Sequence, residues 1–191
     1  MEKLSFTEEI QTNRLILRKR KATKKYAEKL STLIKENQNF LKQWMSFAVN
    51  PLSTEEQYKS LLKNDELWEK MENAGYLIFD KSDNLIGASN VSFIDYDVES
   101  AEIGYWLGKQ FTKKGYATET VLALEDEFFN RGLERMEIRC DQLNIDSIKV
   151  ALRCGYTQEG ILRQNDWNAS HDKRIDTVIF SKLKSEWKQN R

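Results

Sequence analysis

Hydrophobic residues recur along the chain with two different spacings. Apolar residues three or four positions apart predict helices, whereas apolar residues in alternation, or in short runs between turn residues, predict strands. The predicted helices cover residues 22–35, about 40–44, 53 into the low seventies, 115–130 and 144–154. The predicted strands cover residues 14–18, 75–80, 85–94, 101–107, 135–141, 156–162 and 177–183. Because strands and helices alternate only in the second half, the pattern predicts a mixed, partly parallel sheet with helices on both faces.

Local signals set several of these boundaries. Ser53 is followed three residues later by Glu56, which is the pattern of a capping box at the start of a helix. Gly132 suits the position just after the end of the helix over 115–130. Asp83 and Asn84 stand between two apolar runs and predict the turn of a hairpin.

Composition narrows the class of protein. Of the 191 residues, 40% are hydrophobic and 31% are charged, so we expect one globular domain over residues 1–191. The 30 basic residues balance the 30 acidic ones, which argues against a nucleic-acid partner. No apolar run is long enough to span a bilayer, and the first ten residues are too polar for a signal peptide. The two cysteines match no zinc or redox spacing and there is a single histidine, so we expect a cytoplasmic protein without a metal site.

The segment over residues 101–120, AEIGYWLGKQFTKKGYATET, is the most informative part of the chain. A strand ends near Leu107, a short polar loop carries Lys113, Lys114 and Gly115, and a helix follows at once. The first amides of a helix lack intrahelical partners and the helix dipole favours negative charge, so this junction predicts an anion site. The alternative is a solvated turn before a helix, because the loop matches neither GxxxxGK[ST] nor GxGxxG.

The residues around this loop carry a family resemblance. AEIGYWL, a polar loop and GYATE together resemble motif A of the GCN5-related N-acetyltransferases, the GNAT superfamily. The start RLILR, the helix start from Asn144 to Ser147, the pair Gly155-Tyr156 and the tail over 176–187 resemble its RimJ/RimL-type branch, which acetylates the N-termini of ribosomal proteins. The resemblance extends from about residue 12 to residue 187. It implies a single α/β (α+β) domain with a mixed, mostly antiparallel sheet of about seven strands and helices on both faces.

The resemblance implies acetyl-CoA as the cofactor, with its pyrophosphate held by the loop amides. The expected cofactor-binding residues end one strand, form the loop or open a helix: Trp106, Leu107, Thr112, Lys113, Lys114, Gly115, Tyr116, Ala117, Thr118, Asn144 and Ser147. The family pattern begins Gln-Gly-x-Gly, and this chain has Thr112-Lys113-Lys114-Gly115 instead, so Lys113 replaces a glycine. Backbone amides remain whatever the side chain, so we expect cofactor binding to persist.

Two carboxylates are candidates for the general base. By strand alternation, Glu102 shares a face with Gly104 and Trp106. A half-buried carboxylate has a raised pKa that suits proton removal from an amine, and Glu102 resembles the base of several family members. The alternative is a glutamate that faces solvent or pairs with Lys or Arg. Asp166 is the second candidate because the branch carries an acidic residue at the matching place; its alternative is a turn-forming Asp beside Asn165.

Asn144 and Ser147 open a predicted helix, and the simplest interpretation of Asn144 is an N-cap. The resemblance implies further roles: Asn144 lies along the CoA arm, and Ser147 protonates or hydrogen-bonds the leaving thiolate. Among the remaining residues, His171 is expected in a surface loop, and Cys140 and Cys154 are expected to be inert thiols. The aromatics of the early helical region are core residues or line an acceptor cleft: Trp44, Phe47 and Trp68.

The function that follows is direct acetyl transfer from acetyl-CoA to an amine in a ternary complex, with the N-terminal α-amine of a ribosomal protein as the favoured acceptor. An α-amine has a pKa of about 8 and a lysine of about 10.4, so the α-amine needs less help near neutral pH. Two alternatives stay open. One is an acetyltransferase for a small polyamine, antibiotic or amino acid; the other is a CoA-sensing domain without catalysis. The partners are thus acetyl-CoA and an amine, no membrane is involved, and the chain is a monomer or a homodimer.

Overall fold

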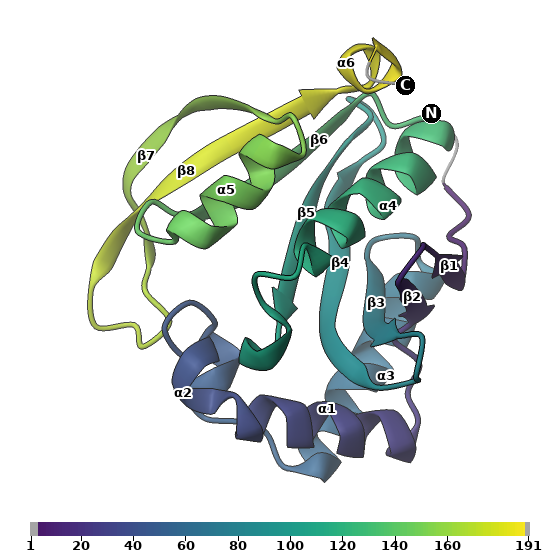
Figure 1. Cartoon of the computed structure of the whole chain (residues 1–191), viewed down its shortest axis with the longest axis vertical. Helices are drawn as coiled ribbons and strands as arrows, with labels where there is room; N and C mark the ends of the chain where they lie inside the picture. The colour runs from purple at the N-terminus through teal and green to yellow at the C-terminus, as the bar shows by residue number, and fades with distance from the viewer. Residues whose placement is uncertain (1–3, 190–191) are drawn as a thin grey trace.

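The computed structural model describes residues 4–189, whose strands form one eight-stranded sheet (Figure 1). The strands lie in the order β1-β2-β3-β4-β5-β6-β8-β7. Their bounds are β1 Glu9–Gln11, β2 Leu15–Lys19, β3 Ala74–Asp80, β4 Leu85–Asp95, β5 Ser100–Leu107, β6 Arg135–Asp141, β7 Thr157–Trp167 and β8 Arg174–Leu183. The helices are α1 Lys24–Glu36, α2 Gln38–Leu41, α3 Thr54–Glu69, α4 Tyr116–Asn130, α5 Ile145–Arg153 and α6 Lys184–Gln189, with short 3-10 turns at Ser46–Ala48 and Lys109–Phe111.

The predicted fold class is confirmed, and the sheet has one strand more than expected. The additional strand is β1, whose three residues are too few to show an alternating pattern and which forms by pairing with β2. The last hairpin is also longer than predicted. β7 continues to Trp167, past a register shift between Leu162 and Asp166, and β8 begins at Arg174. The polar stretch after Leu162 therefore belongs to a strand, because pairing with β8 holds residues whose own pattern is that of a loop.

Most predicted helix boundaries hold closely, but the helix expected at about 40–44 lies at Gln38–Leu41 and leaves Trp44 in the turn that follows. Ser53 and Glu56 form the full capping box of α3, which ends at Glu69, slightly earlier than expected. Gly132 has a positive φ just after α4, as its place beyond the helix end requires. The terminal helix α6 was not predicted, since its six residues are too few for a helical period.

Helices cover both faces of the sheet, as predicted. Alternate residues of β3 point to opposite sides: Tyr76 and Ile78 join a core that includes residues of α4 and α5, whereas Leu77 and Phe79 join a core with α1, α2 and α3. In Figure 1, α4 and α5 lie in front of the sheet. Different helices thus cover the two faces, except that Trp68 near the end of α3 joins the core of α4 and α5. The sheet fixes the positions of the loops between strands and helices.

The centre of the sheet contains a split that positions the candidate site. β5 and β6 are the only parallel neighbours in the described sheet, and they pair only from Ser100–Arg135 to Glu102–Glu137. Beyond these residues the two strands diverge, as Figure 1 shows, while each keeps its outer neighbour. β5 pairs with β4 up to Leu107, and β6 pairs with β8 up to Asp141. The result is a wedge-shaped gap between the diverging parts of β5 and β6, here called the wedge. Along the edges that face this gap the two strands do not pair with each other, so their backbone groups can bind a ligand.

Candidate active site

Two hollows meet at the wedge between β5 and β6. One lies on the side of α4 and α5, and the other lies on the opposite side, between the wedge, the α2 region and the β7–β8 hairpin. The residues that line both hollows come from β5, the α2 region and the start of α5: Trp44, Met45, Tyr105, Trp106, Asn144 and Ser147. A ligand bound in one hollow can therefore reach a ligand bound in the other through the wedge.

The first hollow contains the predicted anion site. The loop turns through two left-handed residues, Lys113 with φ 60° and Gly115 with φ 81°. Gly115 is the N-cap of α4 and has no side chain to cap the helix, so the amides of the first turn keep their hydrogen-bonding capacity. Lys113 holds the left-handed conformation without being glycine, which costs about 1 kcal/mol or more. The loop keeps the backbone shape of an anion cradle although its sequence departs from the family pattern.

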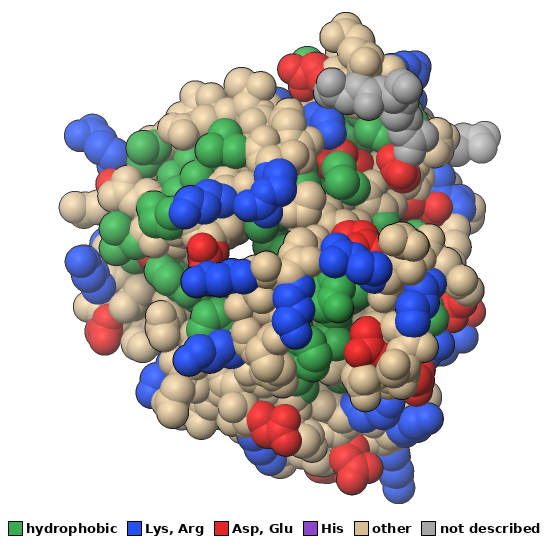
Figure 2. All heavy atoms as spheres, in the orientation of Figure 1, with side chains coloured by type: hydrophobic (Ala, Val, Ile, Leu, Met, Phe, Trp, Pro, Cys, Tyr) green, Lys and Arg blue, Asp and Glu red, His purple; other side chains and the backbone are tan. Residues whose placement is uncertain are grey.

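Basic and acidic side chains both line this hollow. The basic residues lie just before β2, in the loop and in α5: Arg14, Lys113, Lys149 and Arg153. Figure 2 shows Lys and Arg side chains gathered around the hollow on this face of the molecule. The chemistry of this lining, cations around an uncapped helix start, fits the phosphates of a nucleotide-like cofactor.

Ten of the eleven expected cofactor-binding residues line the first hollow. They are Trp106, Leu107, Thr112, Lys113, Gly115, Tyr116, Ala117, Thr118, Asn144 and Ser147. Lys114 is the exception: its ammonium lies over the ring of Phe111, 5.7 Å from the centroid, and it is not part of the lining. The residue contributes its backbone to the loop, and its carbonyl accepts a hydrogen bond from Arg14 at 2.9 Å.

Arg14 braces the loop, a role that sequence reasoning missed. Its guanidinium pairs with Glu119 in the first turns of α4 at 2.7 Å and lies over the ring of Tyr116 at 4.8 Å. Glu119 also accepts hydrogen bonds from the backbone amide of Arg14 and the hydroxyl of Thr12. Burial alone raises the pKa of Glu119, but the bonds from Thr12 and Arg14 outweigh it and leave that pKa lowered. The only sequence signal was Arg14 at the start of RLILR, and its partner lies more than one hundred residues away.

The junction of the hollows carries two hydroxyl groups. Asn144 is the N-cap of α5 and accepts a hydrogen bond from the amide of Ser147 at 3.2 Å, so the predicted capping role is confirmed. Both residues also line the two hollows. The hydroxyl of Ser147 lies 3.0 Å from the phenol oxygen of Tyr105, on the diverging arm of β5. Alternation along the strand places Tyr105 on the face opposite Glu102, and the sequence alone indicated no role for it.

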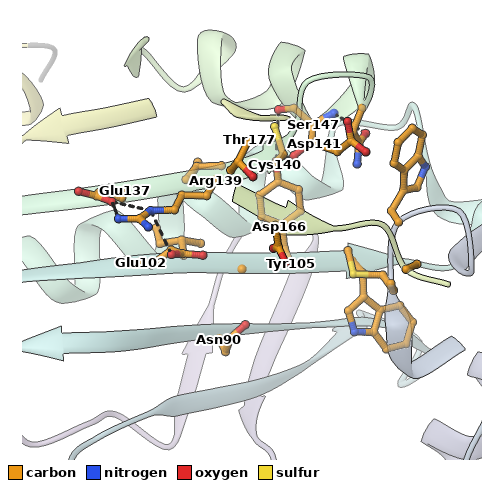
Figure 3. Close-up of a pocket in the computed structure, with 18 of the residues that line it drawn as sticks. Asn90, Glu102, Tyr105, Glu137, Arg139, Cys140, Asp141, Ser147, Asp166 and Thr177 are labelled. Carbon is orange, nitrogen blue, oxygen red and sulfur yellow. Dashed lines mark hydrogen bonds and ion pairs between the residues drawn. The ribbon is translucent and has the colours of Figure 1, made fainter. Parts of the chain in front are cut away.

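The second hollow contains Glu102 beside Arg139 and Glu137 (Figure 3). The Glu102 side chain is 23% exposed, and its carboxylate lies 3.5 Å from the guanidinium of Arg139. Burial raises the pKa of Glu102, Arg139 opposes this rise and Glu137 adds to it, so the pKa is raised overall. Glu137 differs: bonds from Arg135 and Arg139 outweigh its burial and lower its pKa. Glu102 is therefore the carboxylate of this pair that suits proton acceptance.

Asp166 lines the same hollow from the other wall. It lies near the end of β7, is exposed, and accepts a hydrogen bond from the amide of Trp167 at 2.7 Å. The structure thus brings both candidate bases to one groove, and the two side chains differ in how far they are buried. Glu102 is held between strands at the base of the wedge, and Asp166 stands on the outer hairpin.

Aromatic residues also line this groove. Trp44 and Phe47, predicted as core or cleft residues, line it, and the ring of Phe47 lies 5.5 Å from that of Trp106. Phe93 lines it too, with a left-handed φ of 51° and 79% of its surface exposed. Trp68 belongs instead to the core, where it packs against Phe6 and Tyr76. The groove is therefore suited to an amine that carries apolar groups.

The other positions weighed in the sequence are a surface histidine and two free cysteines. His171 is exposed in the turn between β7 and β8, as predicted. Cys154 is buried and Cys140 half-buried; both are free thiols, and burial raises the pKa of each. Within residues 4–189, no cluster of three His, Cys, Asp or Glu side chains is placed to hold a metal ion. In the same part of the chain, no helix is both long enough and apolar enough to cross a membrane.

The sequence is similar to those of known acetyltransferases. The ribosomal-protein-serine acetyltransferase of Escherichia coli (strain K12) is 30% identical over 160 residues, which cover 83% of this chain and 87% of that protein. A putative ribosomal N-acetyltransferase of Bacillus subtilis (strain 168), YdaF, is 33% identical over 171 residues, covering 85% and 88%.

Solved structures are similar as well. RimL, a ribosomal L7/L12 α-N-protein acetyltransferase in complex with coenzyme A, has a TM-score of 0.84 at 27% identity, covering 92% of this chain and 98% of that one. The microcin C7 self-immunity acetyltransferase MccE, in complex with acetyl-CoA and AMP, has a TM-score of 0.84 at 27% identity, covering 90% and 93%. The family model of the acetyltransferase (GNAT) domain matches residues 14–157. This chain belongs to the GNAT acetyltransferase family, as its motifs predicted.

Proposed function

We propose that this chain transfers the acetyl group of acetyl-CoA to the N-terminal α-amine of a protein, with a ribosomal protein as the acceptor. The observation that carries the proposal is the wedge, which joins an uncapped, cation-lined helix start on one side to a groove with a raised-pKa carboxylate on the other. Relatives named as ribosomal-protein acetyltransferases support the acceptor. Structures of relatives that hold acetyl-CoA or CoA support the cofactor.

The residues of the first hollow hold the cofactor. The loop from Thr112 to Ala117 and the first turn of α4 receive the pyrophosphate, and the basic side chains of Arg14, Lys149 and Arg153 surround it. The inner edges of β5 and β6 offer backbone groups to the arm that enters the wedge. Acetyl-CoA supplies the activated acetyl group. Positioning and electrostatic stabilisation by this frame provide much of the rate.

Proton movement is assigned to the second hollow and the junction. Glu102 accepts the proton of the amine, directly or through water, and Asp166 is the alternative base. A backbone amide at the end of β5 polarises the thioester carbonyl. Ser147 donates a hydrogen bond to the sulfur as the thiolate leaves. The α-amine is favoured over a lysine side chain because its pKa of about 8, against about 10.4, leaves more of it neutral near pH 7.

A small-molecule amine is the second candidate acceptor. The aromatic lining of the groove and the similarity to MccE, whose structure holds AMP beside acetyl-CoA, favour it. The proposed location is the cytoplasm, where acetyl-CoA and ribosomal proteins meet. Whether the chain is a monomer or a homodimer stays a prediction.

The test has two stages. Calorimetric titration with acetyl-CoA, with ATP and NAD as controls, should show saturable binding of acetyl-CoA alone. CoA release is then measured with a peptide that has a free N-terminal serine, the same peptide N-acetylated but with an internal lysine, and spermidine. Turnover of the free N-terminus alone supports the proposal, and turnover of spermidine alone supports the second candidate. Binding without turnover on any amine would indicate a CoA-sensing domain.

A further inference from the structure

Two hydroxyl groups, one from each side of the wedge, are within hydrogen-bonding distance of each other. Tyr105 stands on the arm of β5 that has diverged from β6, and Ser147 stands in the first turn of α5, which follows β6. The two oxygens are 3.0 Å apart, and the phenol oxygen is also 3.4 Å from the backbone carbonyl of Ser147 (Figure 3). This contact links the two arms at the point where the hollows meet.

Either hydroxyl can be the donor in this contact, and the protonation state of the phenol decides whether Tyr105 is able to donate. Burial raises the pKa of Tyr105, so the phenol keeps its proton and is a hydrogen-bond donor. The ionisable neighbours of Tyr105 include Cys140, Cys154 and Tyr156, and burial raises the pKa of all three, so none presents an anion to the phenol near neutral pH. A serine hydroxyl has one proton and two lone pairs. When Tyr105 donates to one lone pair of Ser147, the serine proton can point to the neighbouring Cys140 sulfur or to a ligand in the wedge.

We propose that Tyr105 is a positioning residue for acetyl transfer: it donates its O–H to the hydroxyl oxygen of Ser147 and directs the serine proton toward the sulfur of the leaving thiolate. The role rests on the proposed function. In the step concerned, the amine nitrogen bonds to the carbonyl carbon, the carbon–sulfur bond breaks and its electron pair leaves on sulfur. The amine proton goes to the base in the groove. Ser147 hydrogen-bonds the new thiolate, and Tyr105 strengthens that bond because hydrogen bonds in a chain polarise one another.

The kinetic test compares Tyr105→Phe, Ser147→Ala and the double variant, with the N-terminal serine peptide as acceptor. Tyr105→Phe should lower kcat about tenfold, the range of a hydrogen bond to a charged group, with the KM for acetyl-CoA unchanged. The double variant should be no slower than Ser147→Ala alone, because Tyr105 acts only through Ser147. Tyr76→Phe is the matched control: it removes a buried phenol that donates to the carbonyl of Thr7 at 2.9 Å, far from the wedge, and should keep its kcat.

A second test needs no acceptor. At pH 8.5, CoA should bind the wild-type chain more tightly than desulfo-CoA, because the hydroxyl pair stabilises the thiolate, and Tyr105→Phe should lose most of this preference. The role of Tyr105 would be overturned, with acetyl transfer intact, if Tyr105→Phe kept the preference for CoA or if Tyr76→Phe lost it equally. It would also be overturned if the reductions in kcat of Tyr105→Phe and Ser147→Ala were additive in the double variant. Failure of both compounds to bind would overturn the proposed function, and this role with it.

Discussion

Replacing Glu102 by glutamine removes the proposed base with little change of shape. The carboxylate is 23% exposed, lies 3.5 Å from Arg139 and has a pKa raised by burial, so the ionised form is held ready to take a proton. General-base catalysis contributes about 10²–10⁴ to a rate, which corresponds to about 2.7–5.4 kcal/mol of barrier. Glu102→Gln should lower kcat by that factor near neutral pH and leave the affinity for acetyl-CoA unchanged.

The pH profile gives the same residue a second test. A base must be deprotonated to act, so wild-type activity should be lost as pH falls through the raised pKa of Glu102. Arg139 lowers this pKa, so Arg139→Gln should move the acid limb of the profile to higher pH. The matched control is Glu137→Gln, which removes the other carboxylate bound to Arg139 and should keep most of the activity.

The assay is the initial rate of CoA release with the N-terminal serine peptide, measured from pH 5 to pH 9. Unchanged turnover in Glu102→Gln would refute the assignment of the base. The role would then pass to Asp166, whose asparagine variant should be inactive in that case.

Three further predictions concern the frame of the site. Arg14→Met removes the brace between Glu119 and the loop and should weaken acetyl-CoA binding about tenfold in calorimetry with little change in kcat; an unchanged affinity would contradict the brace. Lys182→Met leaves Glu125 buried without its partner and should cost about 3–5 kcal/mol in the free energy of unfolding by denaturant titration; a smaller cost would show that water or movement relieves the carboxylate. Lys113→Gly should change the free energy of unfolding by less than about 1 kcal/mol relative to the wild type, because relief of the left-handed strain offsets the entropy of glycine; a large change would argue against the loop geometry.

Helices and strands with regularly spaced apolar residues could be predicted from the sequence. The α4 helix and its preceding strand carried the apolar spacing, the glycine and the motif that together located the anion site. Glu102 was assigned correctly to the face of Trp106 because alternation along a strand is a local property.

What sequence could not supply was long-range pairing. The extension of β7 through Asp166 depends on β8, and the bond between Arg14 and Glu119 joins the two halves of the chain. The contact of Tyr105 with Ser147 depends on how far β5 and β6 diverge, which no local pattern reports. Such contacts are set by the packing of whole elements.

Acetyl transfer to a protein N-terminus through the wedge can be observed by mass spectrometry of a reaction on ribosomal proteins. The purified chain is incubated with acetyl-CoA and unacetylated ribosomal proteins, with Glu102→Gln as the control, and the modified positions are mapped. We expect a gain of one acetyl group at the N-terminal α-amine of a specific protein, and little or none with the variant. Acetylation confined to lysine side chains, or no acetylation of any protein while a small amine is modified, would contradict it.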